Sequence, residues 1–348
     1  MKDSLLFPVD QLKLFSNDIL VKVGVAPENA DIITETLLLS DLRGVKSHGL
    51  VRLSAYIGRI EAGVMAADKA VDTVMNNKAV ALLDANNSFG QVAGHRAMKL
   101  AIGKAKEYGC GMVMVRNSNH FGITAYYSML AIKEDMIGAV LTNASPAMAP
   151  FRAKTPLLGT NPLSIAVPAN EYPPIILDMS TTVTARGRIR YAAMTGSDIP
   201  LGWALDKCGK PTRNAQEALE GSLEAIGGVK GFGLSLAIDI LCGILTSTAM
   251  TGTVKNITDN SGPAKTGHFF MAIDIAKFDD PENFKNKVDE IIRIVKSMPS
   301  IDDGPVYMLG EIEYMSTSEN LTNGIPLGIE VVNSLNVLAR RYEAPQLS

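Results

Sequence analysis

The sequence predicts an α/β protein. Short apolar runs of strand length, at residues 112–115 and 136–142, alternate with longer segments whose apolar residues recur at helical spacing, as at 281–298. The apolar content of 47% and the charged content of 20% are those of a globular protein. A chain of 348 residues can bury a large core and form two or three subdomains.

Residues 110–143 hold the first candidate for chemistry. The apolar run at 112–115 predicts a buried strand, and the chain then turns abruptly polar at 116–120. A helical segment and a second apolar run at 136–142 complete the pattern of a βαβ unit. Ligands bind beyond the carboxyl ends of the strands in such units, and His120 lies at one such end. The alternative is a histidine that only closes the loop by hydrogen bonds.

The N-terminal part predicts three helices. Apolar residues at helical spacing indicate helices at 9–23 and 50–62, and Pro27 suits the first turn of a helix at 27–39. A polar segment, 41–49, joins the second helix to the third.

A second candidate site lies at the start of the third helix. His48 and Arg52 are four residues apart, so they share a face away from the core leucines if His48 begins the first turn. Ser47 adds a hydroxyl at the same place. A polar cap with a solvated arginine is the alternative interpretation.

The middle of the chain predicts more strands. Residues 78–84 indicate a strand followed by a helix at 91–108, and strands at 163–167 and 175–177 pair around a turn. His95, near the start of the helix, has no evident partner and is interpreted as a surface or packing residue.

Polar residues follow several of these strands. The proline-rich loop 143–150 and the turn 158–162 carry free polar side chains. Asp178, Met179 and Ser180 come at the end of another strand. An acidic residue followed by hydroxyls at such a place suits either ribose hydroxyls or helix capping.

The glycine-rich segment 227–233 is a candidate anion site. It contains Lys230 and opens an apolar helix predicted at 234–245, after a basic helix at 185–194. Backbone N–H groups and the dipole at a helix N-terminus bind anions, and a lysine adds a point charge. Glycines before a helix often serve only close packing, which remains the alternative.

The C-terminal part predicts one strand and two helices. Residues 250–266 indicate a flexible loop, and 269–275 a strand with His268 at its entry, interpreted as structural. An amphipathic helix is expected at 281–298 and a last helix at 329–342.

Composition and motifs argue against several classes of protein. The net charge of −3 gives no footprint for nucleic acid, and no signal peptide is evident. Cys110, Cys208 and Cys242 are isolated, which predicts no metal site and fits a reducing cytoplasm. The apolar run 231–248 contains Asp239 and favours a buried helix over a membrane helix. No GxGxxG motif marks an ordinary Rossmann fold.

Seven stretches, spread over nearly the whole chain, resemble motifs of the type-2 malate/L-lactate dehydrogenases and occur in the same order. These are NAD(P)-dependent oxidoreductases with a fold unlike the Rossmann malate dehydrogenases, and their family also holds sulfolactate and ureidoglycolate dehydrogenases, a diketogulonate reductase and a piperideine-carboxylate reductase. The stretches are LLLSDLRGVKSHGLVRLSAYIGRIEAG, VRNSNHFGITAYYSMLA, MIGAVLTNASPAMAPF, LGTNPLSIAVP, ILDMSTTVTARGRI, GGVKGFGLSLAIDILCGIL and GIPL.

The resemblance implies the type-2 fold, with a mixed central sheet and flanking helices. The domains expected from it are a helical substrate and dimer domain, a cofactor-binding α/β domain and a small helical subdomain. Their residues are 1–75 with 300–348, 76–180 with 230–299, and 181–229.

The resemblance also implies roles for matching positions. His120 matches a proposed acid/base histidine, His48 a proposed proton donor, and Ser47 and Arg52 lie in the substrate-contacting segment. We assign proton transfer to His120 and substrate binding to His48 and Arg52, although the sequence does not decide between the two histidines. The implied contacts for NAD or NADP are Asn143, Ala144, Ser145, Thr160, Asn161, Asp178, Met179, Ser180, Lys230, Leu309, Gly310 and Glu311.

Two departures from the family pattern lie near the expected cofactor loops. Arg152 and Ala153 replace a usual glycine pair, and Leu309 replaces a usual proline. If the first glycine of the pair needs positive φ, Arg152 is strained by about 1 kcal/mol or more.

The expected function is NAD(P)-dependent interconversion of a small 2-hydroxy acid and its 2-oxo acid, of the malate, sulfolactate or lactate type. The expected partners are that small molecule and a second copy in a homodimer, with no nucleic acid and no membrane. The alternatives are an imine or diketo-acid reductase of the same family, a lyase or hydrolase that uses His120 and His48, and a homologue that binds a ligand without a cofactor.

Overall fold

The computed structural model describes residues 4–348 and contains a mixed seven-stranded sheet, in the order β2-β3-β4-β10-β5-β6-β7. Two further sheets have two strands each, β1 with β11 and β8 with β9. The strands are β1 (Ser4–Phe7), β2 (Asp72–Asn77), β3 (Val80–Asp84), β4 (Cys110–Ser118), β5 (Met136–Thr142), β6 (Leu163–Val167), β7 (Ile175–Met179), β8 (Ala204–Leu205), β9 (Ser222–Leu223), β10 (Thr266–Asp274) and β11 (Ile325–Gly328).

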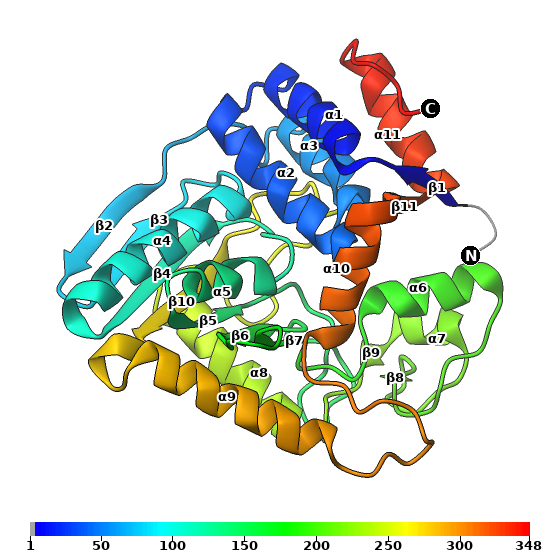
Figure 1. Ribbon diagram of the computed structural model, residues 1–348. Helices are drawn as coiled ribbons and strands as arrows, with labels where there is room; N and C mark the ends of the chain where they lie inside the picture. Colours follow the sequence, from blue (N-terminus) through cyan, green and yellow to red (C-terminus); the bar gives the residue numbers. More distant parts are fainter. Residues whose placement is uncertain (1–3) are drawn as a thin grey trace.

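Helices cover both faces of the large sheet. They are α1 (Val9–Lys22), α2 (Pro27–Leu42), η1 (Leu50–Arg52), α3 (Leu53–Glu61), α4 (Gly90–Tyr108), α5 (Ala125–Ile132), α6 (Arg186–Thr195), α7 (Ala215–Glu220), α8 (Val229–Asp239), η2 (Ile240–Ile244), η3 (Ile275–Lys277), α9 (Pro281–Lys296), α10 (Glu311–Asn323) and α11 (Ile329–Arg341). Helices α4 and α5 pack on one face, whereas α8 and the π-helical turn η2 pack on the other (Figure 1).

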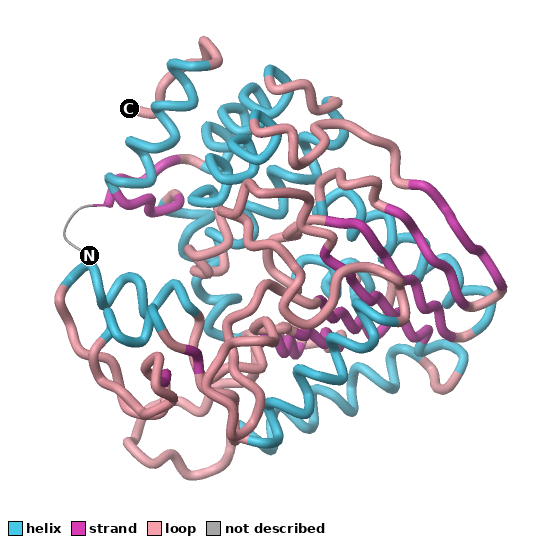
Figure 2. The backbone as a smooth tube through the Cα atoms, turned by 180° about the vertical axis from the view of Figure 1, so that it is seen from behind, coloured by secondary structure: helices cyan, strands magenta, loops and turns pink. Residues whose placement is uncertain are grey.

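The predicted βαβ unit is interrupted by a strand from far along the chain. β4 and β5 run parallel, but β10 lies between them and pairs antiparallel with both. Neighbouring parallel strands are instead β3 and β4, joined by α4. The view from behind shows the strands of the large sheet side by side (Figure 2). The polar loop after β4 still leaves the carboxyl end of a central strand, as the sequence predicts.

Strongly periodic segments are predicted well, and weakly patterned ones are not. The pattern does not predict β1, β2 or α10; all six residues of β2 are exposed, and α10 has little amphipathic character. The predicted start of the apolar helix at residue 234 is wrong, because α8 begins at Val229. β7 extends through Asp178 and Met179, which therefore lie within a strand.

The largest hydrophobic core joins the helical N-terminus to the sheet. It includes buried residues of α1, α2, α4, β4, β10 and α11, with smaller cores around α6–α7 and under α8. Because one core runs through both larger predicted domains, the domain boundaries remain a prediction. Within residues 4–348, no helix combines the length and apolar character needed to cross a membrane.

Arg152, which stands where the family pattern usually has glycine, has a left-handed backbone. Its φ is 67°, in the left-handed region, and its side chain is exposed. A non-glycine residue in this region costs about 1 kcal/mol or more. The position does need a positive φ, so the backbone of Arg152 is strained, as expected from the sequence.

Candidate active site

The segment that carries His48 is held by the end of α2. The buried carboxylate of Asp41 accepts a hydrogen bond of 2.8 Å from the backbone N–H of Leu50. A Cβ atom added at Gly49 would lie 2.0 Å from a carboxylate oxygen of Asp41, so only glycine permits this approach. Burial raises the pKa of Asp41 to about 7.

Ser47, His48 and Arg52 lie together, as the sequence predicts. The Ser47 hydroxyl is 2.7 Å from Nδ1 of His48. Nε of Arg52 donates to the Ser47 carbonyl at 2.6 Å, which fixes the guanidinium beside the imidazole. The two terminal nitrogens of Arg52 have no hydrogen-bond partner among residues 4–348, so they are available to a ligand.

His120, on the loop after β4, meets this group from a distant segment of the chain. Its ring stacks on that of His48, with centroids 5.4 Å apart and planes inclined by 22°. The hydroxyl of Tyr56, on α3, is 2.7 Å from Nδ1 of His120. At the start of α4, a Cβ atom at Gly90 would lie 2.2 Å from the Asn119 carbonyl, so the helix packs closely against the histidine loop.

Both histidines therefore have Nδ1 occupied and Nε2 free. Ser47 contacts Nδ1 of His48, and Tyr56 and the N–H of Gly122 contact Nδ1 of His120. In the described part of the chain, no residue bonds to either Nε2. Both side chains are half-buried, and the two imidazoles and the guanidinium of Arg52 lie close together.

The environment keeps both imidazoles neutral at pH 7. Burial, followed by the charge of Arg52, lowers the pKa of His48 to about 4. Burial also lowers the pKa of His120 well below its usual value, with smaller contributions from His48 and Arg52. A bound carboxylate would offset the charge of Arg52 and favour the protonated imidazole, because opposite charge stabilises an imidazolium.

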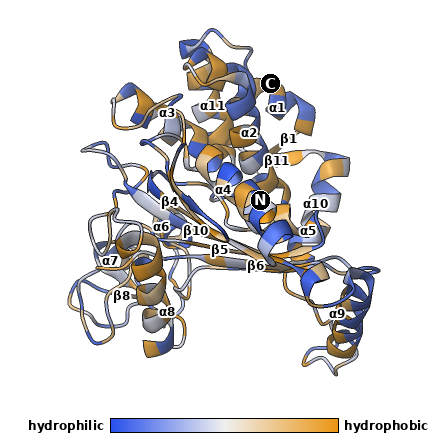
Figure 3. Cartoon of the chain, turned by 90° about the vertical axis from the view of Figure 1, so that its left-hand side faces the viewer, coloured by the Kyte–Doolittle hydropathy of each residue, from blue (hydrophilic) through white to orange (hydrophobic). Residues whose placement is uncertain are grey.

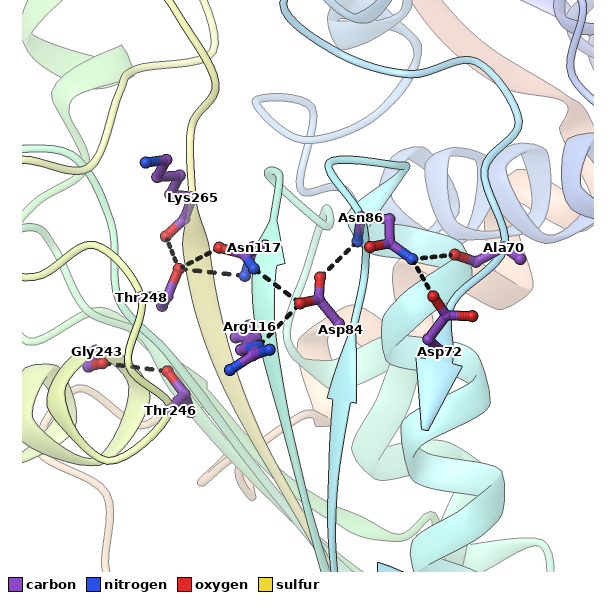
Figure 4. A network of polar contacts seen from close by, with 10 residues as sticks. All are labelled: Ala70, Asp72, Asp84, Asn86, Arg116, Asn117, Gly243, Thr246, Thr248 and Lys265. Atoms are coloured by element: carbon purple, nitrogen blue, oxygen red, sulfur yellow. Dashed lines mark hydrogen bonds and ion pairs between the residues drawn. The ribbon is translucent and has the colours of Figure 1, made fainter. Parts of the chain in front are cut away.

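A polar network fixes the ends of β3 and β4 immediately before the His120 loop (Figure 4). The Asp84 carboxylate accepts from Nε of Arg116 and from the amide of Asn117, each at 2.9 Å. The Thr248 hydroxyl bonds to Asn117 and to the Lys265 carbonyl. Asn117 has a φ of 51° within β4, so these contacts hold an irregularity in the pairing of β4 with β10, just before the His120 loop.

The other histidines have structural partners. His268 lies within β10, fully buried, with Thr142 and Ser118 hydroxyls 2.7 and 2.8 Å from its two nitrogens. Its ring stacks on that of Phe121, with centroids 4.3 Å apart, and Phe121 is the residue that follows His120 in the chain. His95, for which the sequence shows no partner, lies 3.0 Å from the Tyr126 hydroxyl.

Tyr56→Phe is expected to lower turnover about tenfold while leaving KM nearly unchanged. The hydroxyl can donate to a neutral Nδ1 and accept from a protonated one, so it keeps His120 oriented in both states. The measurement is turnover against pH for both proteins. A positioning role moves the pH of half-maximal turnover, whereas an unchanged profile would reduce Tyr56 to a packing residue.

The asparagines predicted to contact the cofactor are engaged within the protein. The Asn143 side chain is buried, donates to the Ala249 carbonyl at 2.8 Å and accepts from Gly267 at 2.9 Å. The buried Asn161 side chain accepts from the N–H of Ala144 and donates to the Ser235 carbonyl. These asparagines thus shape the loop, and their contact with a cofactor remains a prediction.

The other predicted residues of these loops are more open. Ser145 and Thr160 are half-buried; Ser145 accepts from Asn256, and the Thr160 carbonyl accepts from Thr181. Ala144 is likewise half-buried.

Asp178 joins the sheet to α5. One carboxylate oxygen accepts from the N–H of Ala125 at 3.0 Å, which caps the helix. The side chain is exposed, yet the protein surrounds enough of the carboxylate to raise its pKa to about 6, against the opposing effects of Ala125 and Arg43. Met179 and Ser180 follow on the same edge and are half-buried. Capping is confirmed, and a ribose contact remains a prediction.

The remaining predicted segments adjoin this edge. Ile176 donates to the Leu309 carbonyl at 3.0 Å, Gly310 has a φ of 84°, and Glu311 pairs with Lys296. Lys230 is exposed in the first turn of α8.

The exposed lysine at the start of α8 fits a phosphate-bearing cofactor. Gly227 and Gly228 have φ of 56° and 62°, and a Cβ atom at Gly228 would meet no atom within 4 Å. The hollow of about 260 Å³ beside them is lined by Ile226, Gly227, Lys230, Gly231 and Leu234. The N–H groups of Gly228, Lys230 and Gly231 donate to carbonyls within this turn, so the exposed ammonium of Lys230 is the group here that suits phosphate oxygens. A hollow of about 380 Å³ against α4 contains none of the predicted site residues.

The fold and the site are those of a dehydrogenase, and the comparisons with known proteins agree. The chain belongs to the malate/L-lactate dehydrogenase family, whose model matches residues 7–336. This confirms the family and the type-2 fold inferred from the sequence stretches.

Among its relatives, malate dehydrogenase of Pyrococcus abyssi is 39% identical over 343 residues, covering 96% of this chain and 94% of the relative. L-sulfolactate dehydrogenase of Methanothermobacter thermautotrophicus is 38% identical over 336 residues, covering 97% and 96%. The crystal structure of malate dehydrogenase from Entamoeba histolytica superposes with a TM-score of 0.95 at 34% identity, covering 99% of this chain and 100% of that one.

Two residues of the site escape the sequence reasoning. Tyr56 occupies an otherwise apolar helix face, yet it is four residues after Arg52, the same spacing that links Arg52 to His48. Extending that spacing by one step would have found it. Asp41 gives no local signal, because its partner Leu50 bonds through the backbone.

Proposed function

We propose that this protein is a nicotinamide-dependent 2-hydroxyacid dehydrogenase. The observation that supports this best is that His48, His120 and Arg52, from separate segments of the chain, lie together with unbonded side-chain nitrogens. A 2-oxo acid requires a cation for its carboxylate and a proton donor at its carbonyl oxygen, and these groups supply both.

Each residue has a separate task in carbonyl reduction. The unpaired terminal nitrogens of Arg52 bind the substrate carboxylate as a fork, and Nε2 of His48 orients the carbonyl group. Nε2 of His120 gives its proton to the carbonyl oxygen as negative charge develops there, and regains a proton from solvent after product release. In the oxidation direction the same nitrogen takes the hydroxyl proton.

A nicotinamide cofactor, when bound, exchanges a hydride, and so both electrons, with the substrate carbon. Lys230 at the start of α8 would hold its phosphates, and the edge at Asp178, Met179 and Ser180 would face a ribose. NAD and NADP are both compatible with these groups.

We propose in addition a homodimer in a reducing cytoplasm. The dimer is supported by apolar side chains that remain 40–57% exposed along one helix and the turn after it, where Figure 3 shows mainly hydrophobic residues on α8. These are Val229, Leu234, Ile240, Ile244 and Leu245. Such a contiguous apolar surface marks an interaction site. The cytoplasm is supported by three cysteines that form no disulfide.

The function is tested by mixing the protein with NADH or NADPH and a panel of 2-oxo acids, including pyruvate, oxaloacetate and 3-sulfopyruvate. Oxidation of either cofactor by at least one acid is expected, together with quenching of cofactor fluorescence on binding. Absence of binding by both cofactors would overturn the proposal. Binding without oxidation by any acid would favour the ligand-binding alternative.

A further inference from the structure

Helix α6 passes directly beside the candidate active site. A Cβ atom added at Gly187 would lie 3.9 Å from Cβ of Ser47, the residue between Arg52 and His48 in the hydrogen-bond chain. Arg190 lies three residues after Gly187 and therefore on the same face of the helix. Arg186 lies one turn before Arg190. The geometry thus gathers three guanidinium groups, those of Arg52, Arg186 and Arg190, around one edge of the site.

Two of these arginines are anchored and the third is open. Arg52 donates to the Ser47 carbonyl, and Arg186 donates to the carbonyls of Leu219 at 2.9 Å and Pro146 at 3.4 Å. Arg190 is exposed and makes no side-chain hydrogen bond to any residue in 4–348. Its guanidinium can therefore move to contact a ligand group that the two anchored arginines do not reach.

The positive charge of this cluster is not neutralised by the protein. Across residues 4–348, no carboxylate forms an ion pair with any of the three arginines. Burial lowers the pKa of Arg52, and the charge of Arg190 lowers it further. Burial and Arg190 have the same effect on Arg186. Like charges held together in a partly desolvated place favour binding of an anion.

If the substrate had a single carboxylate and it bound Arg52, the positive charge of Arg190 would remain without a counter-charge. We infer that Arg190 binds a second anionic group of the substrate, so that the preferred 2-oxo acids carry a carboxylate or sulfonate on the carbon beyond the carbonyl. This rests on the proposed function, in which Arg52 binds the carboxylate next to the carbonyl. This contact would select dianionic acids over monoanionic ones such as pyruvate, and the residue that makes the selection lies on α6.

The experiment compares the wild type with Arg190→Gln and a matched control, Arg188→Gln. Arg188 is exposed on the same helix but lies two residues away, on another face. kcat/KM is measured with oxaloacetate, 3-sulfopyruvate and pyruvate at constant ionic strength. We expect Arg190→Gln to lower kcat/KM for the two dianions by roughly 10- to 100-fold, the loss typical of one charged hydrogen-bond partner. Its effect on pyruvate, and every effect of the control, should stay within about threefold.

Equal losses with all three acids, or an unchanged preference, would overturn the role of Arg190. A parallel measurement separates this outcome from failure of the proposed function. Calorimetric titration of L-malate and L-lactate, with and without the reduced cofactor, reports binding without turnover. Weaker malate binding in Arg190→Gln supports the anion site even if the wild type reduces no 2-oxo acid. Equal malate binding by both proteins would refute the site independently of catalysis.

Discussion

His120→Ala is expected to lower turnover with a 2-oxo acid by roughly a hundredfold or more. The substitution removes the nitrogen that exchanges a proton with the substrate oxygen, but leaves Arg52 and His48 to bind the substrate. KM should therefore change much less than kcat. Steady-state kinetics with saturating cofactor measure both quantities.

His95→Ala is the matched control. Its histidine is also half-buried and also contacts a tyrosine hydroxyl, but it lies on α4 and faces Tyr126. Near-wild-type turnover is expected for this variant, and circular dichroism checks that both variants fold. If His120→Ala retained near-normal turnover, the proton transfer would have to be assigned to His48.

Asp41→Asn is expected to change how stability depends on pH. The native pKa of Asp41 is about 7, against an ordinary value of 3.8, because burial disfavours the charged carboxylate. Between these values the native state binds more protons at this group than the unfolded state does. Its contribution to stability is therefore complete below pH 3.8 and is lost as the pH rises to 7. The free energy of unfolding should fall by about 4 kcal/mol over this pH range, at 1.36 kcal/mol for each pKa unit.

The measurement is the free energy of unfolding by denaturant, for the wild type and Asp41→Asn, between pH 4 and 8. Asparagine stays neutral, so the wild type should lose stability relative to the variant as the pH rises to 7. Above about pH 7 the difference should level off, because Asp41 is then deprotonated in both the native and the unfolded state. Asp198→Asn, which changes an exposed aspartate, should run parallel to the wild type. Parallel curves for Asp41→Asn would show that Asp41 ionises normally.

The candidate residues His120, His48 and Arg52 could be picked out from the sequence because their signals are local. His120 follows a strand, and His48 and Arg52 are four residues apart, so short-range pattern picks out both places. His48 does not begin the helix, because η1 starts at Leu50 and His48 lies in the bend before it. Their convergence was not predictable from pattern, since it depends on the stacking of two rings from distant segments. The family resemblance, and not the spacing, supplied that expectation.

The cofactor loops show the limit of reading polar residues in sequence. Asn143 and Asn161 look free in a loop, yet both are buried and bonded to backbone groups more than 70 residues away along the chain. A buried loop must satisfy its own backbone groups, and an asparagine side chain does this well. Sequence alone cannot distinguish that use from contact with a ligand.

The position of β10 bears on how the chain acquires its shape during synthesis. The two strands that flank it end by residue 142, whereas β10 begins at Thr266, so their facing edges stay unpaired until more than a hundred further residues have been made. Open strand edges invite association with other chains. The nascent protein consequently depends on late arrival of one segment to close its centre, and the loop bearing His120 reaches its final setting only when His268 is inserted beside it.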